Sequence, residues 1–235
     1  MASKTESSFG AKLQRGNDMH QYISNFPNFA PPRPEESPSE FNNLLGNITM
    51  VNMEETMLQQ QYSTAVATRI KAFRDDPFSV VKLLAPIRAQ VQAQYGKNGI
   101  EFKQVDAIVQ RMRKTELSIR PATPDTPAIK VSQSEQSYGS MLQYFSDLTQ
   151  VLTQLPGYNP SNPQLQVGQL QAFAQQLVQL SAEVAARYQM VRDCRNRRRA
   201  LYDELHDRAQ RIKAYVKANY GTKSQEYALI KGLRI

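Results

Sequence analysis

The residues able to do acid–base, thiol or metal chemistry are few in this chain. It has one cysteine, Cys194, and two histidines, His20 and His206. These counts exclude a disulfide framework, a zinc site of Cys and His ligands and a c-type haem attachment. Cys194 falls on an apolar stripe, which favours a buried structural thiol. The carboxylates beside His206 could raise its pKa, but a solvated helical face explains them better.

Motifs for phosphate, nucleotide or acyl chemistry are also missing from the sequence. It contains no Gly-x-Gly-x-x-Gly, no Walker A sequence and no Gly-x-Ser-x-Gly elbow. Acidic pairs such as Asp75-Asp76 are adjacent, and neighbours on a helix point about 100° apart, so they form no catalytic dyad. A di-metal bundle would need inward Glu and His pairs, which the sequence lacks. We therefore expect no enzyme activity, no cofactor and no metal.

The formal charge of +8 is divided unevenly along the 235 residues. Residues 1–68 have a net charge of −3, residues 69–120 of +6, residues 121–186 of −3 and residues 187–235 of +8. This alternation of acidic and basic segments suggests a duplicated unit.

An internal repeat at an offset of 125 residues agrees with that alternation. Residues 87–102 and 212–227 share seven identical positions, among them a Tyr-Gly pair. Two upstream pairs keep the same offset: Ser37-Pro38 with Asn162-Pro163, and Leu45 with Leu170. The repeat predicts that the chain arose by duplication.

Each copy is predicted to contain a long helix, a second helix, a glycine stop and a short helix. In the first copy Ser37 is the expected N-cap and Pro38 the first helical residue. Apolar residues then recur every three to four positions until Pro77 ends the run. Gly96 and Gly221 follow the second helices, where a left-handed cap favours glycine.

The predicted fold class is all-α, with two tandem helical bundles that contain long antiparallel helices. We expect an extended Pro-rich N-terminal arm, a first helical repeat, a Pro/Thr linker and a second repeat that forms a four-helix bundle. The bounds of these domains are 1–36, 37–117, 118–137 and 138–235. The second repeat starts with a helix from about Tyr138 to Leu155, and residues 129–131 are the only strand candidate.

The N-terminal arm carries four large apolar side chains within eight residues: Tyr22, Ile23, Phe26 and Phe29. A composition rich in Pro, Ser and Asn is typical of a disordered tail. Four large apolar groups are more than such a tail needs, so we predict that they bind a partner, for example a groove on a neighbouring subunit.

A basic cluster in the C-terminal segment supplies candidate contacts to an anion or a nucleic acid: Arg195, Arg197, Arg198 and Arg199. The isoelectric point of about 9.6 agrees with such binding. On a helix these arginines cannot share one face, and acidic residues follow one turn later. Nucleic-acid binding is therefore the alternative, and a protein partner or a homo-oligomer is the first expectation.

The C-terminal pattern resembles one found in uncharacterised helical proteins of bacteria, mainly of the Bacteroidetes group. The residues that carry this resemblance are Arg211–Lys217, Tyr220-Gly221, Ser224–Tyr227 and Ile230–Gly232, with Tyr158-Asn159-Pro160 upstream. It covers about residues 141–235, with an eroded copy at 37–113. The resemblance implies a bacterial origin and no activity.

Together these observations predict a non-enzymatic structural or interaction subunit of a self-associating or larger assembly. Its contacts are expected to come from the N-terminal arm and the charged helix faces. The alternative is a basic accessory protein that binds nucleic acid. No apolar run approaches the ~20 residues of a membrane span, and the N-terminus lacks the apolar core of a signal peptide. We expect a cytoplasmic protein, or one within a particle assembled inside the cell.

Overall fold

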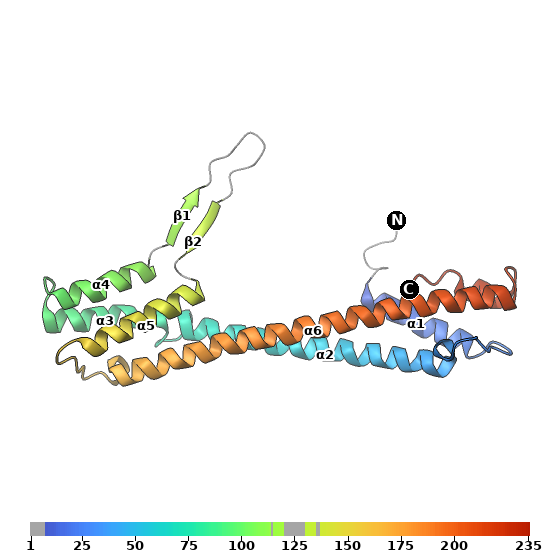
Figure 1. The fold of residues 1–235 in the computed structure, drawn as a ribbon, viewed down its shortest axis with the longest axis horizontal. Helices are drawn as coiled ribbons and strands as arrows, with labels where there is room; N and C mark the ends of the chain where they lie inside the picture. Colours follow the sequence, from blue (N-terminus) through green and yellow to red (C-terminus); the bar gives the residue numbers. More distant parts are fainter. Residues whose placement is uncertain (1–7, 114, 120–129, 135–136) are drawn as a thin grey trace. The chain divides into compact units, whose positions relative to one another are not determined.

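The computed structural model describes residues 8–113, 115–119, 130–134 and 137–235, and its fold is all-α with one small hairpin (Figure 1). The α-helices are α1 (Phe9–Ile23), α2 (Pro38–Ile70), α3 (Val80–Tyr95), α4 (Ile100–Arg113), α5 (Tyr138–Gln154), α6 (Val167–Asn219) and α7 (Gln225–Ile230). The short turns are the 3-10 helices η1 (Pro34–Glu36) and η3 (Pro163–Leu165) and the π-helix η2 (Lys71–Asp75).

Several helix ends lie where the local sequence predicts them. α2 begins at Pro38, and the Ser37 hydroxyl accepts a hydrogen bond from the Glu40 amide at 3.4 Å. Gly96 and Gly221 have φ angles of +76° and +94°, which side chains other than glycine rarely adopt. Local signals therefore fix the ends of these elements.

The second long helix continues past the point where the repeat predicts a boundary. α6 is one helix of 53 residues, whereas α2 passes into η2 and the chain leaves the helix before Pro77. Proline lacks the N–H that a helix interior needs. No proline or glycine occurs between Gly168 and Gly221, so nothing in that stretch interrupts α6. The expected separate second helix of the second copy is thus the end of α6.

The chain divides into two compact units. Unit 1 comprises Met1–Gln61 and Tyr188–Ile235, and unit 2 comprises Tyr62–Arg187. This division differs from the predicted domains 37–117 and 138–235, because α2 and α6 each contribute one part to unit 1 and another to unit 2. A helix of 53 residues is about 80 Å long, more than one small core can cover.

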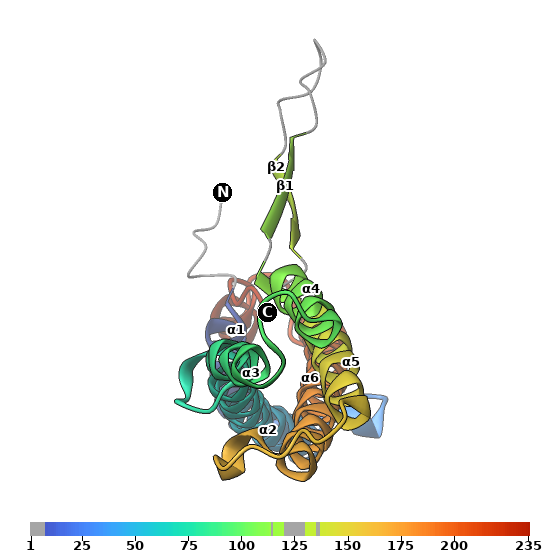
Figure 2. The ribbon, with the colours of Figure 1, turned by 90° about the vertical axis from the view of Figure 1, so that its left-hand side faces the viewer.

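Each unit has its own apolar core. The core of unit 1 is built from α1, the first part of α2, the last part of α6 and α7, with these side chains among its members: Met19, Ile23, Phe41, Ile48, Ile212 and Ile230. The core of unit 2 contains these: Phe73, Leu84, Ile87, Phe145, Leu152 and Leu170. Figure 2 looks onto unit 2 and shows α3, α4, α5 and the start of α6 following one another around the end of the unit.

The predicted linker 118–137 is described only in part. Two antiparallel strands, β1 (Thr115–Ile119) and β2 (Lys130–Ser134), pair Thr115 with Ser134 and Ile119 with Lys130. Lys130 and Val131 lie in β2, where the sequence suggests a strand, and Ile129 lies outside the described residues. The Pro/Thr run 120–127 also lies outside them.

Contacts of an arginine with an aromatic ring occur in the same way in both units. In unit 1 the Arg198 guanidinium lies over the Phe9 ring, 4.6 Å from its centroid, and in unit 2 Arg69 lies over Tyr138 at 4.1 Å. A second ring packs on each of these, Tyr202 on Phe9 and Phe73 on Tyr138. The residues that play the same part in the two units are 129 positions apart in each case: Arg69 and Arg198, Phe9 and Tyr138, and Phe73 and Tyr202.

A second match involves a tyrosine in each unit, one bonded to the loop after α1 and the other to the loop after α5. The Tyr220 hydroxyl donates to the Pro27 carbonyl at 2.7 Å, and the Tyr95 hydroxyl donates to the Pro156 carbonyl at 3.0 Å. The prolines are 129 positions apart and the tyrosines 125. The next residues, Asn28 and Gly157, both have positive φ angles.

The matched contacts recur at two offsets, whereas the sequence repeat predicts a single offset of 125. Residues 8–73 match residues 137–202 at an offset of 129, from the N-caps Ser8 and Ser137 to the rings of Phe73 and Tyr202. The later pair of Tyr95 and Tyr220 matches at an offset of 125. The start of α2 at Pro38 and the start of α6 at Val167 are also 129 positions apart, four more than in the expected match of Ser37-Pro38 with Asn162-Pro163. The change of offset from 129 to 125 falls where η2 and the turn at Pro77 interrupt the first segment, whereas α6 is continuous.

Candidate interaction surfaces

The four arm residues predicted to bind a partner pack against the core of their own unit: Tyr22, Ile23, Phe26 and Phe29. Ile23 is 1% exposed. The Phe26 ring lies 5.8 Å from the Tyr220 ring, and the Phe29 ring meets the Tyr215 ring edge-on at 5.3 Å. These contacts give the arm residues a binding site within the chain itself.

Polar contacts hold the same arm in place. The Ala30 amide donates to the Tyr215 hydroxyl at 3.1 Å, and the Arg208 guanidinium donates to the Glu35 carbonyl at 2.8 Å. The Glu36 side chain is 3% exposed and accepts a hydrogen bond from Nε of Arg211. The arm is therefore ordered by α6 through apolar, hydrogen-bonded and ionic contacts.

The basic cluster on α6 is largely paired with α2. The Glu55 carboxylate accepts a bond from Arg195 at 2.9 Å and one from Arg198 at 3.0 Å. The Glu55 side chain is 14% exposed, so water screens these pairs less than it screens surface pairs. Sequence reasoning missed this pairing because Glu55 precedes Arg195 by 140 residues.

The other two arginines of the cluster have different surroundings. Arg197 donates to the Glu54 carboxylate at 2.6 Å, and this bond raises the pKa of Arg197 above its usual value. Arg199 is exposed. Three of the four arginines thus have acidic partners on α2, which leaves less positive charge for an anion than the sequence suggests.

The thiol and imidazole singled out in the sequence lie in structural surroundings. Cys194 is 0% exposed, its Sγ lies 3.7 Å from the Val51 carbonyl oxygen, and burial raises the pKa of the thiol. A thiol with a raised pKa stays protonated at neutral pH and is a poor nucleophile. The Nδ1 atom of His206 lies 2.6 Å from the Ile235 carbonyl oxygen, where it helps to fasten the last residues.

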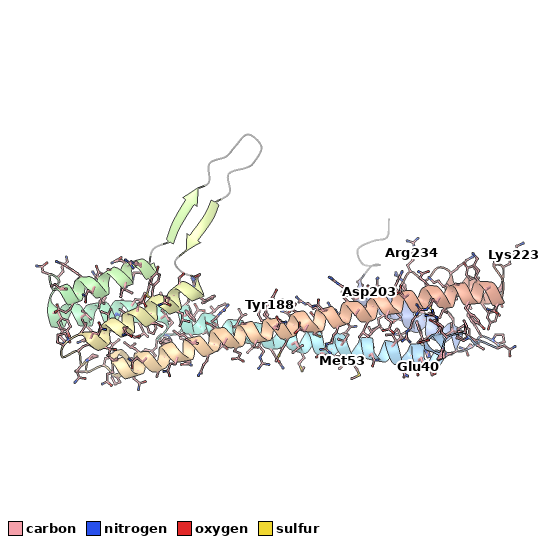
Figure 3. The ribbon with its side chains drawn as sticks, viewed as in Figure 1. Glu40, Met53, Tyr188, Asp203, Lys223 and Arg234 are labelled. Carbon is pink, nitrogen blue, oxygen red and sulfur yellow. The ribbon has the colours of Figure 1, made fainter. Side chains whose placement is uncertain are left out.

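Unit 1 also exposes a face of α2 that the sequence analysis overlooked. We call Gly46, Met50, Met53 and Met57 the Met face; Met50 and Met53 are each 70% exposed, and Met57 is 54% exposed. Spacings of three and four residues place them on one side of the helix. Figure 3 shows Met53 on the side of α2 that faces away from α6. Large exposed apolar side chains in one row are an interaction signal.

A groove adjoins the Met face. It has a volume of about 470 Å³, and both α2 and α6 line it. Its walls include Asn47, Met50 and Val51 from α2 and Ala200 and Leu201 from α6. The groove is mainly apolar, and its charged lining residues are paired: Glu54 with Arg197, and Glu204 with Arg208.

One polar network of unit 1 has no counterpart in unit 2. In unit 1 the Asn52 amide donates to the Tyr202 hydroxyl at 3.0 Å. The residues 129 positions away are Ser181 and Phe73, and phenylalanine has no hydroxyl, so the buried Ser181 hydroxyl has no partner. Likewise Val184 takes the place of Glu55, so unit 2 has no carboxylate at the position that pairs with Arg198 in unit 1.

Among the described residues, no group of three or more His, Cys, Asp or Glu side chains is placed to hold a metal ion. None of the helices in the described part of the chain is long and apolar enough to cross a membrane. No family model, characterised protein or solved structure matches this chain. The resemblance to bacterial helical proteins stays a prediction.

Proposed function

We propose that this protein is a non-enzymatic structural subunit that associates through a helix face, with its own copies or within a larger assembly. The observation that carries the proposal is the exposed Met face of α2. A solvated helix face is usually charged, yet residues 41–68 contain only two charged side chains, Glu54 and Glu55. Both are engaged by arginines of α6. An uncharged face with three exposed methionines is typical of a binding surface.

We further infer that the chain is a duplication in which the copies have exchanged their halves. The arginine–aromatic and tyrosine–proline contacts, which recur at offsets of 129 and 125, support this inference. Unit 1 combines the first half of one copy with the second half of the other, and unit 2 combines the remaining halves. As a result, α2 and α6 each contribute residues to both units.

The direction of the long helices is part of the same proposal. In unit 1, Glu36 of the arm pairs with Arg211, and Glu55 further along pairs with Arg195. The residue number of the α6 partner therefore decreases as the residue number of the glutamate increases. This supports helices that run in opposite directions. A frame of this kind suits a subunit that presents one helix face to a partner.

The alternative of nucleic-acid binding receives less support. Three of the four candidate arginines have carboxylate partners. A protein that neutralises several phosphates loses affinity steeply as salt rises. We expect weak binding to nonspecific duplex DNA at low salt, with a shallow slope of log affinity against log salt.

Sedimentation velocity of the full chain over a range of concentrations tests the proposed function. We expect a species of at least twice the chain mass of 26.7 kDa at micromolar concentration. A mass of 26.7 kDa at every concentration, with a steep salt dependence of DNA binding, would instead support the nucleic-acid alternative.

A further inference from the structure

We propose that the Met face binds the Met face of a second copy of this chain, with the two α2 helices crossing about a two-fold axis near Met53. This inference rests on the proposed function and names the partner. It is an isologous interface, in which the same residues of both copies meet.

A comparison of the two units shows that the fold does not require these methionines. The residues 129 positions after Gly46, Met50, Met53 and Met57 are Gln175, Gln179, Ala182 and Ala186. They lie on α6 in unit 2 and are exposed as well. A position that accepts glutamine or alanine in one unit holds methionine in the other for a reason other than packing within the unit.

Charge favours a second copy at this face. The chain has a formal charge of +8, so most pairs of surfaces from two copies repel one another. A two-fold axis also places a charge that lies close to it near the same charge of the other copy. The Met face has no charged side chain. The charged side chains that line the adjoining groove are paired within the chain, Glu54 with Arg197 and Glu204 with Arg208. This face can therefore meet itself without like-charge contacts.

Shape favours the same arrangement. The groove of about 470 Å³ lies beside Asn47 and Met50, and Met57 projects from the helix two turns further on. With opposed helices and an axis near Met53, Met57 of each copy lies opposite the groove of the other. The methionine side chain is unbranched and flexible, which suits it to fill an irregular apolar groove.

Gly46 fits this interface at its edge. No atom lies within 4 Å of a Cβ placed on Gly46, so its own unit does not require a glycine there. Glycine in an exposed helix interior costs about 1 kcal/mol relative to alanine. A bare backbone lets another helix approach closely, which gives the glycine a role in the dimer.

The first test replaces the three methionines of the Met face by the residues found at the matching positions of unit 2. The full chain with Met50→Gln, Met53→Ala and Met57→Ala should keep its helical circular dichroism and lose at least tenfold in dimer affinity by sedimentation. The matched control, Val178→Gln with Met190→Gln, changes exposed apolar residues of α6 and should leave the affinity unchanged. A triple variant that dimerises like the parent would overturn the proposed face and leave self-association intact.

The second test uses the axis. In a Cys194→Ala background, Met53→Cys places a thiol near its own copy and should form an intermolecular disulfide on mild oxidation. Asn42→Cys is exposed on the same helix but far from the axis, and it should not cross-link. Equal cross-linking of both variants, or of neither, would contradict the arrangement. A parent chain that is monomeric at all concentrations would show that the proposed function itself is wrong, and a different protein would then be the occupant of the face.

Discussion

The ion pair between Glu36 and Arg211 should respond very differently to the loss of each partner. The Glu36 side chain is 3% exposed, while the Arg211 side chain is 41% exposed. Arg211→Met leaves a carboxylate buried without a partner, and breaking a buried pair in this way costs about 3 to 5 kcal/mol. Glu36→Leu leaves a guanidinium that water can reach, so its loss resembles that of a surface pair, about 0 to 1 kcal/mol.

Unit 2 indicates that leucine fits this position. Leu165 lies 129 positions after Glu36 and is 4% exposed in the core of its unit. Exchanging Glu36 for leucine therefore adds apolar burial at a position that accepts this side chain in the matched unit. The difference between the two variants should be at least about 2 kcal/mol in the free energy of unfolding.

Urea unfolding followed by far-ultraviolet circular dichroism measures this difference. The slope of the free energy with urea should be the same for both variants, so that the midpoints report stability alone. If Glu36→Leu destabilised the chain as much as Arg211→Met, the reasoning from burial would be refuted.

Three further predictions concern the arm, the half-buried Tyr158 and Arg69 of unit 2. Ile23→Ala should lower the free energy of unfolding by about 2 to 5 kcal/mol, because the side chain is 1% exposed in the core of unit 1. Burial raises the pKa of Tyr158 from 10.0 to about 12, so the folded state favours the protonated phenol and stability should fall as the pH rises from 10 to 12. Absorbance titration should show this late ionisation, and Tyr158→Phe should remove it. Val184→Glu should place a carboxylate near Arg69, and a double-mutant cycle with Arg69→Met should give a coupling of about 0.5 to 3 kcal/mol.

Each of these predictions has a result that contradicts it. An Ile23→Ala chain of unchanged stability would mean that the arm does not contribute to the core. A tyrosine titration that ends near 10, or one that Tyr158→Phe leaves unaltered, would oppose the burial of that phenol. A coupling of zero between positions 184 and 69 would argue against the match of unit 2 with the Glu55–Arg198 pair of unit 1.

Local features of the structure were predictable because they depend on neighbouring residues. The start of α2 after Ser37, the start of α5 at Tyr138, the end of the helix before Pro77 and the left-handed Gly96 all follow from capping, proline and glycine chemistry. The all-α class follows from the period of the apolar residues.

The grouping of the helices was not predictable in the same way. Apolar stripes say which side of a helix is buried but not which other helix covers it. Each copy is therefore expected to form its own domain, whereas in the structure the start of α6 belongs with α3 and the end of α6 with α1. The pairing of Glu55 with Arg195 depends on the same tertiary arrangement.

Because the sequence does not show which helices pack together, one candidate site was expected to bind a neighbouring subunit and another was not predicted. Phe26 and Phe29 are apolar residues that the sequence predicts to need a partner. In the structure their ring neighbours are Tyr220, just after α6, and Tyr215 of α6, both in the same chain. The Met face could have been found, since Met50, Met53 and Met57 recur at helical spacing in a segment with almost no charge. They were missed because the buried stripe on the other side of the helix accounted for its amphipathic pattern.

The central claim, that two copies meet through α2, is tested most directly by a distance between the copies. A single nitroxide label attached to Met53→Cys in the Cys194→Ala chain gives no intramolecular pair, so any dipolar signal comes from a second copy. The account predicts one narrow, short distance for this label and a longer one for the label at Asn42→Cys. A sample without any dipolar coupling at concentrations well above the expected dissociation constant, or one in which position 42 gives the shorter distance, would contradict it.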